Sequence, residues 1–83
     1  MTRGKVIVPK MVLQNQIRTL RFMHGEMTQQ DLADRIGVSR QTINAIEGGK
    51  YSPTLEAAFQ IARVFGRPLD EVFQCVVTRG GRV

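Results

Sequence analysis

The sequence predicts an all-α fold, in which five helices pack around one core. Two observations lead to this prediction. Hydroxyl residues that can cap the start of a helix alternate along the chain with glycines that can end one, and the apolar residues between them recur at the helical period. The chain has 83 residues and one cysteine, so its modest core depends on helix packing and not on a disulfide framework.

The first predicted helix runs from about Gln14 to His24 and ends at Gly25. Asn15 is an alternative N-cap for this helix instead of a residue of its first turn. The spacing of the apolar residues turns one face toward the core. The expected inward residues are Leu13, Ile17, Leu20 and either Met23 or Met27.

A second helix is predicted behind Thr28, which is a good N-cap. Asp31, three residues later, can accept a hydrogen bond from the cap's own N–H, and the two residues then form a capping box. The helix extends from Gln29 to about Ile36. Gly37 ends it, because glycine tolerates a positive φ at little cost.

A third helix begins at Arg40, behind a Ser39 N-cap. Only three residues separate it from the helix before it, which forces the two helices to pack against each other at a steep angle. This pattern is a helix-turn-helix. The residues expected to be buried between the two helices are Leu32, Ala33, Ile36, Val38, Ile43 and Ile46.

The helix that begins at Arg40 has two different faces. Ile43, Ile46 and Glu47 point to one side of it. The opposite side carries a guanidinium and two carboxamides, which can pair with base edges, among small residues that let a helix lie deep in a major groove. The residues of this side are Arg40, Gln41, Asn44, Ala45 and Gly48. A solvated helix carries the same residue types, but the preceding helix, the glycine turn and the caps in register favour DNA binding.

Two further helices complete the predicted bundle. Thr54 caps a helix that ends at Gly66, and Arg67–Pro68 begins a short last helix through Phe73. The apolar residues of the longer helix, which follow the helical period, are Leu55, Ala58, Phe59, Ala62 and Phe65. The inward residues of the last helix are Leu69, Val72 and Phe73.

From about Leu13 to Phe73, the chain resembles the lambda-repressor-like, XRE-type family of small DNA-binding regulators. The matching residues are Thr28-Gln29, Leu32-Ala33, Gly37-Val38-Ser39, Thr42-Ile43, Ile46-Glu47, Gly49-Lys50 and Pro53. The resemblance implies a compact five-helix DNA-binding bundle. Glu26 departs from the family pattern, as one extra residue between the first two helices.

The resemblance also implies roles for individual residues. Thr28 and Gln29 would bind phosphate at the start of the first helix of the motif, and Lys50 would bind it in the loop after the second. The second helix, the recognition helix, would face the bases through Ser39, Arg40, Gln41, Asn44 and Ala45. The family often pairs an arginine of the first helix with the glutamate that closes the recognition helix, and Arg21 and Glu47 fill these positions.

The net charge of +5 is concentrated at the two ends of the chain. Residues 14–73 carry seven basic and seven acidic side chains, so the body is neutral. We therefore divide the chain into an N-terminal basic extension (1–12), a helix-turn-helix DNA-binding domain (13–73) and a C-terminal tail (74–83). The excess charge comes from Arg3, Lys5, Lys10, Arg79 and Arg82.

Two interpretations of the ends stay open. The basic residues could follow DNA phosphates as flexible arms. Alternatively, the runs Lys5–Val8 and Cys75–Thr78, which are rich in β-branched residues, could pair as strands within or between subunits. Such pairing would be a dimerisation device.

The sequence predicts no enzyme, metal site or cofactor. One histidine and one cysteine cannot build a zinc site of the usual kind, and no catalytic triad is visible. No segment reaches the roughly 18 apolar residues of a membrane span. We therefore expect a cytoplasmic protein without a membrane partner.

The sequence favours a transcriptional regulator that binds double-stranded DNA sequence-specifically. The predicted mechanism is that of a repressor, a homodimer that inserts the helix starting at Arg40 into the major groove. One recognition helix is a small surface, so two copies would read half-sites about 34 to 36 Å apart. The alternative is a protein-interaction module, such as an antitoxin that neutralises a partner protein, with DNA binding secondary.

Overall fold

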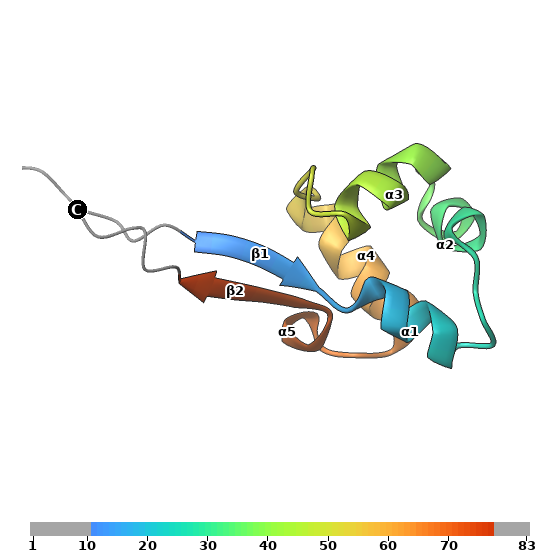
Figure 1. The fold of residues 1–83 in the computed structure, drawn as a ribbon. Helices are drawn as coiled ribbons and strands as arrows, with labels where there is room; N and C mark the ends of the chain where they lie inside the picture. The colour runs from blue at the N-terminus through green and yellow to red at the C-terminus, as the bar shows by residue number, and fades with distance from the viewer. Residues whose placement is uncertain (1–10, 78–83) are drawn as a thin grey trace, which may run out of the picture.

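The computed structural model describes residues 11–77, which form five α-helices and a two-stranded sheet (Figure 1). The elements in chain order are β1 (Met11–Asn15), α1 (Ile17–Met23), α2 (Gln29–Ile36), α3 (Arg40–Glu47), α4 (Leu55–Phe65), α5 (Leu69–Val72) and β2 (Phe73–Val77). The helices form a bundle from which the two strands extend as a ribbon (Figure 1). The prediction of five helices is confirmed, but the all-α class is wrong because the chain also forms a sheet.

The ribbon brings together the two ends of the described chain. β1 and β2 are antiparallel, with Met11 opposite Val77 at the far end and Asn15 opposite Phe73 next to the bundle. Valine and phenylalanine in these segments fit a pleated surface well. Strand pairing also supplies hydrogen-bond partners to backbone groups that no helix satisfies.

The ribbon changes two boundaries that the sequence analysis predicted. The last helix ends at Val72 and not at Phe73, because Phe73 begins β2. The predicted strand Cys75–Thr78 begins two residues earlier than expected, because β2 starts at Phe73. Its residues 75–77 lie in β2, and Thr78 lies outside the described residues. The strand pairs with β1, whereas the predicted partner Lys5–Val8 lies outside the described residues.

Hydroxyl caps begin three of the helices, as predicted. Thr28, Ser39 and Thr54 each accept a hydrogen bond from the backbone N–H three residues further on. The N–H of Thr28 also donates to the carboxylate of Asp31, which completes the capping box. Gly37 ends α2 with a φ of 77°, a left-handed conformation that is unfavourable for residues with a side chain.

The first helix begins later than predicted. It starts at Ile17 and not near Gln14, because the preceding residues belong to β1. Its N-cap is Gln16, whose side chain makes no capping hydrogen bond. Instead, Asn15 Oδ1 accepts a hydrogen bond from the Ile17 N–H at 3.2 Å, and Asn15 Nδ2 donates to the carbonyl of Ile46 at 3.0 Å. Asn15 therefore joins the ribbon, α1 and α3.

The core contains most but not all of the predicted residues. Met27 is buried, whereas Met23 is 62% exposed. On α4, Leu55 and Phe59 follow the helical period as apolar residues but are 69% and 51% exposed, and Ile61, which the sequence analysis did not name, is completely buried. The largest fully buried side chains are Ile17, Leu32, Ile43, Ile61 and Val72. Partly buried residues that pack against them include Ile36, Val38, Leu69 and Phe73, and Leu13 is 41% exposed in β1.

Replacing Asn15 by alanine should lower the free energy of unfolding by about 1–3 kcal/mol, because it leaves the Ile46 carbonyl and the Ile17 N–H without this partner. Chemical denaturation followed by circular dichroism measures the change. Gln14→Ala is the matched control, since Gln14 is its exposed neighbour in β1 and its truncation should change stability by less than about 0.5 kcal/mol. Equal effects of the two variants would contradict a joining role for Asn15.

Candidate nucleic-acid interface

The outer face of α3 lies at the surface of the bundle, next to α2 and on the side away from α5 (Figure 1). Ile43 and Ile46 are buried and fix the inner face of the helix on the core. The predicted base-facing residues are on the outer face, where Ser39, Arg40, Gln41 and Asn44 are exposed and Ala45 is half-buried. Ser39 also accepts the capping hydrogen bond from the Thr42 N–H at 3.1 Å, so its hydroxyl has a structural role.

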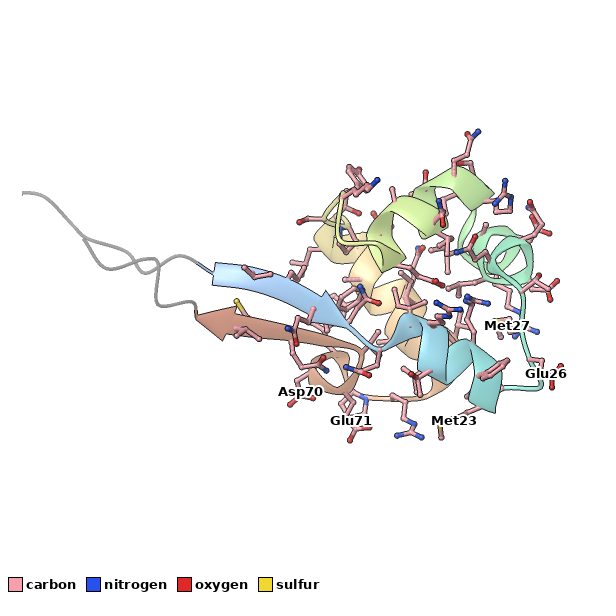
Figure 2. The ribbon with its side chains drawn as sticks, viewed as in Figure 1. Met23, Glu26, Met27, Asp70 and Glu71 are labelled. Carbon is pink, nitrogen blue, oxygen red and sulfur yellow. The ribbon has the colours of Figure 1, made fainter. Side chains whose placement is uncertain are left out.

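The acidic residues of α5 lie far from this face. Figure 2 shows Asp70 and Glu71 on the opposite side of the bundle from α3. Glu71 is also paired with Arg67, with Nη1 3.0 Å from Oε1. Because the repulsion between charges falls with distance and is screened by salt, these two carboxylates do not oppose an anionic ligand at α3.

Glu47, at the end of α3, forms an ion pair with Arg21 of α1. Arg21 Nε lies 2.6 Å from Glu47 Oε2, and Arg21 Nη2 lies 3.2 Å from Oε1. The two side chains are only 15% and 10% exposed. Arg21 Nη1 also donates to the carbonyl of Met27 at 2.7 Å. One guanidinium therefore holds α1, the loop before α2 and the end of α3 together.

A second set of contacts, which the sequence analysis did not predict, joins α2 to α3. Gln29 Nε2 lies 3.2 Å from Asn44 Oδ1 and 3.2 Å from Glu47 Oε1. Asn44 and Glu47 are three residues apart on one helix and are therefore neighbours on its surface. This spacing was the only indication in the sequence that one side chain could contact both of them. Gln29, which was predicted to bind phosphate, thus contacts Asn44, which was predicted to face the bases.

The start of α2 is held by reciprocal hydrogen bonds. The Thr28 N–H donates to Asp31 Oδ2 at 3.2 Å, and the Asp31 N–H donates to Thr28 Oγ1 at 3.0 Å. The hydrogen bonds from the Thr28 backbone and hydroxyl hold the pKa of the Asp31 carboxyl below its usual value. The resulting carboxylate lies at the helix N-terminus, where negative charge is favourable. Thr28, a predicted phosphate ligand, is exposed at this capped end.

Two basic residues flank these contacts. Lys50 is exposed in the turn after α3, and its N–H donates to the Ala45 carbonyl at 2.9 Å. Arg18, which the sequence analysis did not assign, borders a polar hollow between the helices. The hollow is lined by Asn15, Arg18, Arg21, Gln29, Asn44, Glu47 and Gly48. The predicted phosphate ligand Lys50 and this hollow lie at the same end of α3.

Within residues 11–77, no three histidine, cysteine, aspartate or glutamate side chains gather closely enough to bind a metal ion. No helix in this range is both long and apolar enough to cross a membrane.

Two capped helices joined by three residues, with a polar helix exposed on the surface, define a helix-turn-helix protein. The comparison with known families agrees, because the helix-turn-helix family model matches residues 17–72. The chain belongs to this family, the lambda-repressor-like, XRE-type helix-turn-helix regulators that bind DNA.

Proteins that are similar in sequence are named as transcriptional regulators or repressors. An uncharacterised HTH-type transcriptional regulator of Methanocaldococcus jannaschii is 49% identical over 61 residues, which are 74% of this chain and 91% of that protein. The transcriptional repressor of the cryptic phage CTXphi, from Vibrio cholerae, is 36% identical over 58 residues, 70% of this chain and 51% of the repressor.

Solved structures share the fold. A DNA-binding protein from Bacteroides fragilis, of inferred function, superposes with a TM-score of 0.66 at 21% identity and covers 76% of this chain and 100% of its own. The transcriptional regulator VanUg superposes with a TM-score of 0.68 at 16% identity and covers 92% of this chain and 100% of its own.

Replacing Glu47 by alanine should destabilise the protein by about 3–5 kcal/mol, because the Arg21 guanidinium, whose side chain is only 15% exposed, is left as an uncompensated charge. Glu71→Ala is the control, since it removes an ion pair whose side chains are 40% and 52% exposed and should change stability by no more than about 0.5 kcal/mol. Thermal and urea unfolding of both variants measure the difference. A Glu47→Ala protein as stable as the wild type would show that the pair does not hold α3.

Proposed function

We propose that the protein is a repressor that binds a specific double-stranded DNA sequence as a homodimer, with α3 in the major groove. The observation that supports it most is the exposed outer face of α3, which is fixed on the bundle by buried isoleucines and by the Arg21–Glu47 pair. A rigid, exposed helix that presents guanidinium and carboxamide groups suits direct reading of base edges.

Each exposed residue of α3 has a chemical role in this proposal. Arg40 is suited to the O6 and N7 of guanine, and Gln41 and Asn44 to purine edges. Ala45 meets a thymine methyl group, and Ser39 contacts a base beside the helix start. Phosphates are bound by Thr28 and Gln29 at the start of α2 and by Lys50 after α3.

Dimerisation follows from the small size of one recognition helix, because two helices reading half-sites one DNA turn apart supply the specificity that one lacks. The described surface carries apolar side chains suited to a subunit contact. Those on and near the ribbon are Val12, Leu13, Tyr51, Leu55 and Val76, each at least 38% exposed. The sign of regulation is proposed from the phage relative, which is named as a repressor.

The first experiment is selection of binding sites from a random double-stranded DNA pool at near-physiological salt, together with sedimentation equilibrium of the free protein. A short inverted repeat with half-site centres about one helical turn apart, bound by a dimer, would support the proposal. A pool without enrichment would contradict it and favour the protein-interaction alternative.

Arg40→Ala should weaken binding to the selected site by about 1–3 kcal/mol and relax the preference at one base pair, because a bidentate contact to guanine is lost. Fluorescence anisotropy on the selected site and its single-base variants measures both effects. An equal loss on every sequence would show that Arg40 binds phosphate and not a base.

Lys50→Ala should weaken binding to all sequences alike, because a phosphate contact carries no base information. The slope of log K against log salt concentration should fall by roughly one. Titrations at several salt concentrations test this. A change in base preference, or an unchanged slope, would exclude the assignment of Lys50 to the DNA backbone.

A further inference from the structure

The side-chain amide of Gln29 lies between the partly buried carboxylate of Glu47 and the exposed side chain of Asn44. Its nitrogen is 3.2 Å from Glu47 Oε1 on one side and 3.2 Å from Asn44 Oδ1 on the other. Glu47 is 10% exposed and Gln29 is half-buried, whereas Asn44 is exposed on the outer face of α3. The three residues form a chain that runs from the interior to the proposed DNA-binding face.

The charge of Glu47 determines the direction of every hydrogen bond in this chain. An ionised carboxylate only accepts hydrogen bonds, and the Glu47 carboxylate forms an ion pair with the Arg21 guanidinium at 2.6 Å. Gln29 must therefore turn its NH2 group, and not its oxygen, toward Glu47. The same NH2 group faces Asn44, so Asn44 turns its oxygen inward to accept. The NH2 group of Asn44 takes no part in this contact with Gln29 and points away from it.

We propose that Gln29 is a positioning residue that fixes the side-chain amide of Asn44 with its donor group available to DNA. This inference rests on the proposed function, in which α3 reads bases. Asn44 then favours base edges with acceptors, which are the N7 of purines, the O6 of guanine and the O4 of thymine. It disfavours cytosine, whose major-groove edge presents the N4 donor.

The same geometry defines how Gln29 meets a phosphate. Both N–H groups of its side chain already have acceptors, Asn44 and Glu47. Its remaining side-chain atom is an oxygen, which accepts hydrogen bonds and repels an anion. A phosphate at the start of α2 is therefore bound by the main-chain N–H of Gln29 and not by its side chain.

The test is Gln29→Met, which keeps the length of the side chain and removes the amide. Gln30→Met is the matched control, because Gln30 is the next residue of α2 and donates to Asp34 at 2.8 Å, outside the chain of contacts. Site selection with the wild type and with Asn44→Ala first identifies the base pair that Asn44 reads, as the position whose preference the alanine variant loses. Melting temperatures verify that all variants are folded.

Gln29→Met should reduce the preference at that base pair by about threefold or more, in line with coupling between contacting residues, while preferences at other positions are retained. In the Asn44→Ala background, Gln29→Met should cause no further loss there. Gln30→Met should leave the profile unchanged. A uniform loss of affinity across all sequences with Gln29→Met would overturn the inference and return the amide to phosphate binding.

Failure of this inference is distinguishable from failure of the proposed function. A wild-type protein that selects no site contradicts the function, and with it the role of Gln29. A wild-type protein whose selected preference depends on Asn44 but not on Gln29 contradicts the positioning role alone.

Discussion

The ion pair between Arg21 and Glu47 holds the exposed helix α3 in a fixed orientation on the bundle. Replacing a buried ion pair by apolar residues is often neutral or stabilising. The main effect of such a pair is therefore to fix the orientation of the elements that it joins, and not to add net stability. The planar guanidinium presents its donors in a fixed fork, and here it contacts the end of α3 and the carbonyl of Met27 at once. These contacts restrict how α3 can rotate on the bundle.

The local features of the fold could be predicted from the sequence because each depends on a few neighbouring residues. Thr28, Ser39 and Thr54 need only an N–H three residues further on to cap a helix, and Gly37 needs only its own φ. The Arg21–Glu47 pair links residues 26 positions apart, so no local rule indicates it. It was expected through the family resemblance alone.

The features that the sequence analysis missed depend on how distant segments pack. Leu55 and Phe59 fit the helical period of α4 but are exposed, because periodicity identifies an apolar stripe and not the width that neighbouring elements cover. Leu13 was assigned to a helix face, but its segment forms a strand because β2 lies alongside it. The contact between Gln29 and Asn44 depends on the angle between α2 and α3, which helix propensity does not determine.

The pairing of Met11 with Val77 places the start of β1 and the end of β2 side by side. Directly opposed Cα atoms of antiparallel strands are about 4.5–5.5 Å apart, and the ribbon extends away from the helices (Figure 1). A domain whose two chain ends lie side by side can be inserted into a surface loop of a host protein without separating the ends of that loop. The ribbon of β1 and β2 would then connect the helical bundle to the host protein. The same two ends could equally be linked to each other and the chain opened at another loop, which gives a circular permutant.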